Sequence, residues 1–405
     1  MSAPPLDVLV LGAGPAGSAS ATLLARAGLR VLVVDRDTFP REKACSEYLS
    51  PEAVRVLDRL GVTRTLEAAG AAPLLGTVVT ASRGATLEGR FARAVPAPAR
   101  PTGLSVARRL LDAALVDAAR HAGATVHERA TVAALLEEGG RVAGAVLREA
   151  GGRTRALRAR LVIGADGLRS LAARRIGGVR RAWPRRVAFV AHVADVPGLA
   201  ASAQMHVGPD GYVGLNPLGG GVANVALVTR AARARAAAGD ATGFFLRELE
   251  RFEGVRGRVR GDAIVRAVLA TGPFGVRARR VVADGALLVG DAADFFDPFT
   301  GEGICTALRG AELLEPVVRA ALAAEAMPGA RALAPYAAAR RRTFAGKWAV
   351  ERLIGRAMEW PALFDHAVGR IGRRRGMADT LVGVTGDFVP ARAVLNPWFL
   401  ARMVV

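Results

Sequence analysis

The chain has 405 residues, 51% of them hydrophobic, only two cysteines and a formal net charge of +20. The hydrophobic share excludes a largely disordered protein, and the two cysteines exclude a disulfide scaffold or a multi-cysteine metal site, so no metal is expected. No apolar run approaches the roughly 20 residues of a membrane-spanning helix.

The positive charge is nearly all arginine, because Lys43 and Lys347 are the only lysines. It is scattered along the chain, and aromatic residues make up only 5%, which leaves little for stacking on nucleic-acid bases. We therefore expect a solvated basic surface and no nucleic-acid partner, with attraction to anionic lipid or to an acidic carrier protein as alternatives. The first strand begins by residue 7, which leaves no room for a signal peptide, so a cytoplasmic protein is expected.

A nucleotide-binding pattern opens the chain. Residues 7–11 predict a buried parallel strand, residues 15–28 predict a helix that ends at Gly28, and residues 31–34 predict a second strand. The glycines of the turn permit a tight bend, close approach of the backbone to a pyrophosphate, and close packing of helix and strand, while the helix N-terminus attracts phosphate. The motif residues are Gly12, Gly14, Pro15, Ala16 and Gly17.

An acidic residue follows this motif at the distance expected for a ribose-binding carboxylate. Asp35 ends the second strand, and Arg36 comes next. A carboxylate at this distance from the glycines typically binds a ribose hydroxyl, and it would repel a 2′-phosphate. The pattern therefore predicts a dinucleotide with a free ribose, either FAD or NAD.

Two later motifs decide between these cofactors. Residues 162–170 contain an Asp-Gly segment, and residues 290–304 combine Gly-Asp-Ala-Ala with a P-x-x-G-x-G turn. Both segments resemble the flavoprotein monooxygenases of the para-hydroxybenzoate hydroxylase type. The resemblance implies FAD held by one discontinuous domain, with NAD(P)H as a transient reductant.

The same resemblance implies roles for individual residues. Asp291 would bind the flavin ribityl chain, and the turn after it would place backbone N–H groups beside the isoalloxazine. Arg108 matches the flavin-contacting arginine of the family, with Arg109 as the alternative register. The other cofactor contacts expected in or near these motifs are Val132, Asp166, Gly290, Pro298, Gly301, Glu302, Gly303 and Ile304.

Within this superfamily one branch fits better. Residues 40–45, 49–51 and 297–304 resemble the geranylgeranyl reductase-like subgroup, which contains isoprenoid double-bond reductases and relatives in secondary metabolism that hydroxylate or halogenate. The chain departs from that subgroup at Ser46, where a glycine is usual, and at residues 211–217, which replace the aromatic Y-x-W-x-F-P strand of the reductases. Because that strand forms the floor of the substrate pocket, the substrate does not carry over.

These motifs predict an α/β fold with three parts: a discontinuous Rossmann-like FAD-binding domain of the glutathione reductase type, an antiparallel β-sheet substrate domain, and a helical C-terminal cap. The boundaries are 1–75, 102–175 and 276–330 for the FAD-binding domain, 76–101 and 176–275 for the substrate domain, and 331–405 for the cap. The elements expected inside them are a helix at 104–122, a strand pair around 139–140, strands at 125–128, 203–207, 212–216, 222–229 and 286–289, and a helix after Gly303.

Four residues are candidates for chemistry. Cys45 would be a pocket thiol that orients or protonates the substrate; the alternative is a small buried hydrophobe. Glu47 would supply an acid; the alternative is a polar residue ahead of a helix. Tyr212 would point its hydroxyl into the pocket, or else pack in the sheet, and Thr300 lies where the turn of the family faces the flavin.

Other notable residues are expected to be structural. Asp297 is expected to cap the helix after Gly303, with contact to the flavin edge as the alternative. Cys305 is expected to pack within that helix. The histidines are expected at the surface or in the core, with a pocket position as the alternative for His192 and His206. The apolar tail at residues 395–405 is expected to pack on its own protein, with capping the pocket, forming a dimer or touching a membrane surface as alternatives.

The leading functional hypothesis is an FAD-dependent monooxygenase that uses NAD(P)H and O2 to hydroxylate an apolar aromatic or polyketide-like substrate in secondary metabolism. The alternative is an FAD-dependent ene-reductase that acts on a prenyl or polyketide double bond, which Cys45 and residues 297–304 favour. A flavin-dependent halogenase is disfavoured because no lysine lies between residues 44 and 346 and a W-x-W-x-I-P signature is absent. A non-catalytic flavin- or lipid-binding protein is disfavoured because all three motifs are intact. The sequence leaves the oligomeric state open.

Overall fold

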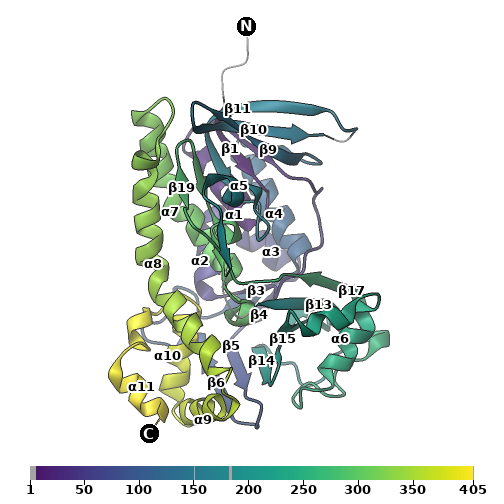
Figure 1. The fold of residues 1–405 in the computed structure, drawn as a ribbon. Coiled ribbons are helices and arrows are strands. Elements are labelled where there is room, and N and C mark those ends of the chain that lie inside the picture. Colours follow the sequence, from purple (N-terminus) through teal and green to yellow (C-terminus); the bar gives the residue numbers. More distant parts are fainter. Residues whose placement is uncertain (1–5, 150, 182–184, 405) are drawn as a thin grey trace.

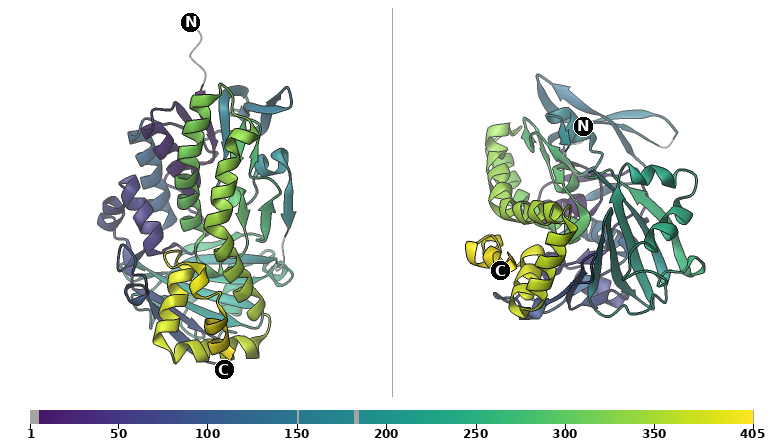
Figure 2. Two further views of the ribbon diagram at one scale, coloured as in Figure 1. Left: turned by 90° about the vertical axis from the view of Figure 1, so that its left-hand side faces the viewer. Right: turned by 60° about the horizontal axis from the view of Figure 1, so that its bottom comes forward.

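The computed structural model describes residues 6–149, 151–181 and 185–404, so Val405 of the apolar tail lies outside it. A parallel sheet with its helices occupies one half of the molecule, and an antiparallel sheet lies across the other half (Figure 1). The long helix α8 (Ala330–Ala357) runs along one side of both halves and leads to the remaining C-terminal helices (Figure 2).

The first sheet has a parallel centre whose strands are buried on both faces. Such strands consist of continuous apolar runs, and Val8, Val10, Leu161 and Ile163 are fully buried here. The strands lie in the order β20 (Ala286–Leu288), β11 (Thr154–Gly164), β1 (Leu6–Leu11), β2 (Val31–Val34) and β8 (Thr125–His127), with β19 (Val282–Ala283) antiparallel at one edge.

Helices cover one face of this sheet, and a β-hairpin covers much of the other. The apolar sides of α1 (Pro15–Arg26), α4 (Arg108–His121) and α7 (Gly303–Ala324) pack against β1, β2 and β11. The opposite face packs against β9 (Thr131–Glu138), β10 (Arg141–Arg148) and α5 (Leu171–Ile176). The predicted strand pair around residues 139–140 is therefore present.

The second sheet has seven strands drawn from two distant parts of the chain. The three predicted strands of residues 203–229 form its middle, and residues 76–90 join it through the parallel pairing of β14 with β5. The order is β17 (Ile264–Thr271), β13 (Arg186–Ala194), β16 (Val222–Arg230), β15 (Gly211–Gly219), β14 (Ala203–Gly208), β5 (Gly76–Thr80) and β6 (Thr86–Arg90).

The expected helix at residues 104–122 begins later than predicted. Residues 103–105 instead form β7 (Gly103–Ser105), which lies between β3 (Tyr48–Leu49) and β4 (Ala72–Leu74) in a small sheet. The Val106 N–H also donates to the Glu47 carbonyl. This long-range pairing holds the segment extended, so α4 begins at Arg108.

Smaller elements connect these sheets. The remaining helices of the first two parts are α2 (Pro51–Leu60), α3 (Thr63–Ala68) and α6 (Ala241–Leu249). A three-stranded sheet contains β12 (Val179–Arg181), β18 (Val276–Ala278) and β21 (Asp294–Phe295). In the part of the chain that the structure describes, no helix combines the length and the apolar character needed to cross a membrane.

The C-terminal region is helical, as predicted, and packs on the edge strand β6. After α8 come α9 (Pro361–Gly372), α10 (Arg375–Thr385) and α11 (Pro397–Val404). A Cβ atom on Gly89 of β6 would lie 2.4 Å from a methyl of Val382 and 2.6 Å from the Ala378 carbonyl oxygen of α10. Glycine is therefore what lets α10 approach the strand.

We expect Gly89→Ala to destabilise the protein by about 1–3 kcal/mol, because the added methyl overpacks this contact. A lowered thermal unfolding midpoint would report it. Gly355→Ala is the control, because a Cβ there meets nothing within 4 Å and a helical Gly→Ala change is neutral or stabilising by up to about 1 kcal/mol. Equal midpoints for the two variants would contradict the packing argument.

Candidate active site

One continuous cavity of about 770 Å³ lies between the two sheets. Its first part runs along the glycine motif and the ends of β1, β2 and β11, and its second part faces β13 to β16 of the antiparallel sheet. Residues from the C-terminal helices, including Ile354 and Val382, close it. The cavity thus joins the predicted cofactor motifs to the predicted substrate sheet.

Most of the predicted cofactor residues line this cavity. They are Gly12, Gly14, Pro15, Ala16, Asp35, Arg36, Arg108, Val132, Asp166, Asp291, Pro298, Gly301, Gly303 and Ile304. Gly17, Gly290 and Glu302 are not among the residues that line it. Gly17 serves helix packing instead, because a Cβ there would lie 1.8 Å from the Gly12 carbonyl oxygen.

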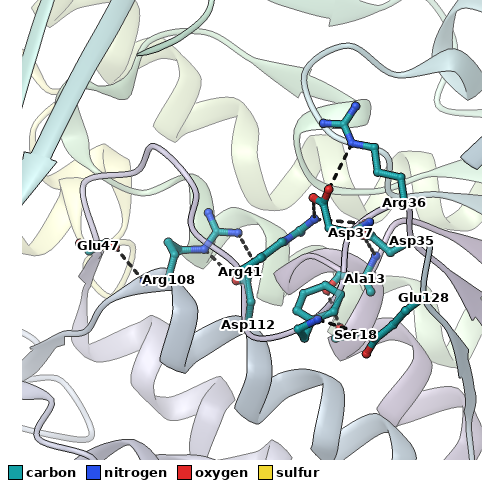
Figure 3. Close-up of polar contacts among 11 residues, drawn as sticks. Ala13, Ser18, Asp35, Arg36, Asp37, Arg41, Glu47, Arg108, Asp112 and Glu128 are labelled. Carbon is teal, nitrogen blue, oxygen red and sulfur yellow. Dashed lines mark hydrogen bonds and ion pairs between the residues drawn. The ribbon is translucent and has the colours of Figure 1, made fainter. Parts of the chain in front are cut away.

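Asp35 organises the glycine turn (Figure 3). Its carboxylate accepts a 2.7 Å hydrogen bond from the Ala13 N–H and a 3.2 Å hydrogen bond from the Arg41 guanidinium. Gly12 has a φ of +102°, and a Cβ there would lie 2.5 Å from the Ala165 carbonyl oxygen. The acid and the glycine together hold the turn open toward the cavity.

A buried pair of charges lies beside this turn (Figure 3). Asp112 accepts 2.7 and 2.8 Å hydrogen bonds from Arg108 and a 3.2 Å hydrogen bond from Arg41. Burial lowers the pKa of Arg108, but Asp112 and the nearby Cys45 thiol outweigh that effect and raise the pKa above its ordinary value. Arg109 is largely exposed, lies near Glu42 and does not line the cavity, whereas Arg108 does.

The residues of this wall fit FAD. The first turn of α1 has no side-chain cap, so its N–H groups remain for a pyrophosphate. Asp35 is at the place for a ribose. Burial raises the pKa of the Asp291 carboxyl to about 6, with Lys43 and Arg108 opposing the shift. When bound, FAD stores two electrons and delivers them as a hydride or singly.

Sequence comparison agrees with this geometry. The model of the "FAD binding domain" family matches residues 5–347. The chain belongs to this family. It is an FAD-dependent oxidoreductase, and the monooxygenase superfamily with its geranylgeranyl reductase-like members is the correct placement.

Curated relatives of this flavoprotein include reductases. The menaquinone reductase of Mycobacterium tuberculosis is 33% identical over 335 residues, which cover 76% of each chain. A digeranylgeranylglycerophospholipid reductase of Methanococcoides burtonii is 31% identical over 314 residues, covering 75% of this chain and 71% of the relative.

Solved structures with the same fold include halogenases. The myxobacterial chondrochloren halogenase has a TM-score of 0.79 at 25% identity, with 87% of this chain and 82% of that chain covered. A flavin-dependent brominase has a TM-score of 0.80 at 20% identity, covering 95% and 94% of the two chains. The brominase match shows the fold alone.

Glu47, predicted as a catalytic acid, does not line the cavity. It is fully buried, and its carboxylate is engaged from three directions. One oxygen accepts from the Arg108 N–H at 2.8 Å, and the other lies 2.7 Å from Nε2 of His192 and accepts from Asn224 at 2.8 Å. Glu47 therefore positions its neighbours, and His192 is its partner rather than a pocket residue.

Cys45 does line the cavity, as predicted. Its Sγ accepts a 3.4 Å hydrogen bond from the Glu47 N–H, and the Arg108 guanidinium interacts with it. Asn224 and Asn216 donate to the carbonyls of Cys45 and Ser46 at 2.9 and 2.8 Å. Neither asparagine was predicted as a site residue, although a polar residue inside an otherwise apolar strand is a usable signal.

Tyr212 lines the cavity, but its hydroxyl is engaged. It donates a 2.5 Å hydrogen bond to Asp297, whose other oxygen pairs with Arg186 at 2.5 Å. Burial and this carboxylate raise the pKa of Tyr212 well above its ordinary value. Asp297 also accepts from the Phe299 N–H at 3.0 Å, so it caps the short 3-10 helix Pro298–Thr300. The prediction that it caps α7 is therefore wrong.

Thr300 lines the cavity and contacts a group of buried charged residues beside the turn at residues 298–303, which we call the flavin turn. Its hydroxyl donates to Glu351 of α8 at 3.3 Å. The neighbouring Glu302 is buried, accepts from Ser50 at 3.2 Å and lies 3.6 Å from the Lys347 ammonium. Burial raises the pKa values of both Glu302 and Glu351 to about 7. Nothing in the sequence indicated that residues of α8 would reach this turn.

The two remaining structural expectations are both confirmed. Cys305 is buried among apolar side chains of α7 and its neighbours, as expected. His206 is buried but does not line the cavity; it packs against Gly254, and burial lowers its pKa to about 4.

We expect Asp35→Asn to weaken FAD binding by about tenfold or more, since a hydrogen bond to a charged group contributes about 1.5–3 kcal/mol. The measurement is the FAD dissociation constant of the deflavinated protein, from quenching of flavin fluorescence. Asp37→Asn is the control, because Asp37 pairs with Arg41 at 2.6 Å but is half-exposed and off the cavity wall. A surface pair of this kind changes affinity by less than about threefold. Equal losses would refute the role of Asp35.

We expect Glu351→Gln to raise the thermal midpoint at pH 8 and to have little effect at pH 5. Burial raises the pKa of Glu351 from 4.5 to about 7, so the native state holds this proton more tightly than the unfolded state. The resulting stability is present below about pH 4.5 and is lost as the pH rises through 7. A gain of at least about 2 °C at pH 8 is expected. A difference in thermal midpoint that does not depend on pH would contradict the assignment.

Proposed function

We propose that this flavoprotein reduces a carbon–carbon double bond in an apolar substrate that carries a prenyl chain. The observation that carries the proposal is the composition of the cavity wall opposite the cofactor motifs. Among the described residues, the antiparallel sheet and the C-terminal helices contribute no charged side chain to that wall. An uncharged wall of this kind suits a hydrocarbon chain.

The reaction needs a hydride at one carbon and a proton at the other. Bound reduced FAD would supply the hydride, and we assign the proton to Cys45, because this residue lines the cavity that also contains the cofactor motifs. Arg108 beside the thiol would stabilise the thiolate that remains. Solvent then returns a proton to the sulfur.

The names of the relatives support this proposal. The menaquinone reductase and the digeranylgeranylglycerophospholipid reductase share a reduction and a prenylated substrate. Their similarity extends over about three-quarters of this chain.

Hydroxylation of an apolar aromatic or polyketide-like substrate with NAD(P)H and O2 is the second candidate. The observation in its favour is Gly214, which stands in the pocket-floor strand where the prenyl reductases have an aromatic residue. Of the neighbouring atoms, a Cβ on Gly214 would meet only the Met205 methyl, at 3.6 Å. The floor therefore carries no side chain at this point, which favours a substrate broader than a hydrocarbon chain.

One experiment separates the two candidates. The FAD-loaded protein is incubated with menaquinone or geranylgeranyl lipids and NAD(P)H or dithionite, without oxygen and then in air, and the products are analysed by mass spectrometry. Double-bond reduction adds two mass units that remain after air re-oxidises any quinol formed by the reductant, whereas hydroxylation adds sixteen and needs air. A product that gains sixteen units in air alone would overturn the proposal.

For the reductase, we expect Cys45→Ala to lower product formation at least about tenfold, because a positioned acid contributes roughly 10²–10⁴-fold. The rate at which NAD(P)H bleaches the flavin should be unchanged. Cys305→Ala is the matched control, since that thiol is buried away from the cavity. Full activity of Cys45→Ala would remove Cys45 as the proton donor.

A further inference from the structure

Large exposed hydrophobic side chains gather on the C-terminal helices. Six of the nine such side chains among the described residues lie there, and the most exposed of the six are Trp360 at 69% and Trp398 at 58%. The six are Leu353, Trp360, Leu363, Leu395, Trp398 and Leu400. The helices that carry most of them lie at the end of the molecule opposite the β9–β10 hairpin (Figure 1).

A surface groove lies in this region. Its lining includes Trp398 and Phe399 of α11, Met377 of α10 and Val95, which is 79% exposed. We call the groove and the exposed residues of the segment 360–403 the C-terminal face. Its apolar residues are brought together from three segments, so no single stretch of sequence shows it.

Arginines surround the groove. The guanidinium of Arg402 lies 3.8 Å from the centre of the Trp398 ring, and Arg374 donates to the Arg402 carbonyl. Arg375 also lines the groove, and Arg373 and Arg392 are exposed nearby in the sequence. The apolar centre therefore has a positively charged rim.

Most acidic side chains of this region are engaged with other parts of the protein, although Glu359 beside Trp360 is exposed. Asp365 accepts hydrogen bonds from the N–H groups of Arg83 and Ala85 in the β5–β6 turn. Asp379 is buried and pairs with Arg93, and Asp387 pairs with Arg309 of α7. Neither of these two acids therefore pairs with the arginines of the groove.

One helix connects this face to the active-site cavity. Met377 and Thr380 of α10 line the groove, whereas Leu381, Val382 and Thr385 of the same helix line the cavity. The groove and the cavity are thus separated by the width of a single helix.

We propose that the C-terminal face docks the protein on the surface of an anionic phospholipid bilayer. Tryptophan places an apolar ring and a polar N–H at the level of the headgroups. Arginine is attracted to anionic lipid when it lies close to the membrane surface. An amphipathic face of this kind binds through both contributions together. The bilayer would also hold an apolar substrate beside α10.

The test is flotation of the FAD-loaded protein with vesicles of phosphatidylcholine alone and with 30% phosphatidylglycerol. We expect binding to the anionic vesicles only, and its loss at high salt. The double variant Trp398→Ser with Arg375→Ser should bind at least about tenfold more weakly while keeping its FAD and its unfolding midpoint. The matched control is Val265→Ser with Arg260→Ser, two exposed residues at the opposite edge of the antiparallel sheet.

Three outcomes would overturn the proposal. One is equal binding to neutral and anionic vesicles by all variants. Another is an equal loss in the patch and control variants, which would indicate general charge attraction. The third is a dimer in sedimentation velocity that the patch variant alone dissolves, which would assign the face to a second copy of the chain. Because the readout is lipid binding, it does not depend on the proposed reaction.

Discussion

The position of the two sheets relative to each other depends on one buried carboxylate. Glu47 has no exposed surface, and a buried charge is costly unless hydrogen bonds replace its water. Its partners come from α4, β13 and β16, so they belong to both halves of the molecule. The N–H of Glu47 also donates a hydrogen bond to the Sγ of Cys45. The cavity between the sheets keeps its shape because this group is satisfied only when α4 and the antiparallel sheet are both in place.

Local patterns made the cofactor half of this structure predictable. The strand, the glycine turn, the helix and Asp35 follow one another within about 30 residues, and each has a physical reason that the sequence shows directly. The Arg108 to Asp112 pair was also readable in principle, because charges four residues apart on a helix are neighbours. What the sequence did not show is that Arg41 adds a second cation to the same acid.

The substrate half was less predictable because its interactions join distant residues. Glu47 and His192 are 145 positions apart, and Tyr212 and Asp297 are 85 apart. Each of these residues had a plausible catalytic or structural interpretation on its own. The contacting partner determines which interpretation holds. The Tyr212 hydroxyl, for example, donates to Asp297 and is therefore engaged within the protein. The contacts of Lys347 and Glu351 of α8 with Glu302 and Thr300 could not be predicted for the same reason.

The packing of α9 and α10 on β6 has a further consequence. An edge strand presents unpaired backbone groups that can template pairing with another chain. Here carboxylates supplied by the helices accept from those groups: Asp379 takes the Arg90 N–H at 2.7 Å, and Asp365 takes two N–H groups in the preceding turn. The C-terminal helices therefore occupy hydrogen-bonding groups at this edge and prevent an eighth strand from pairing with the seven-stranded sheet.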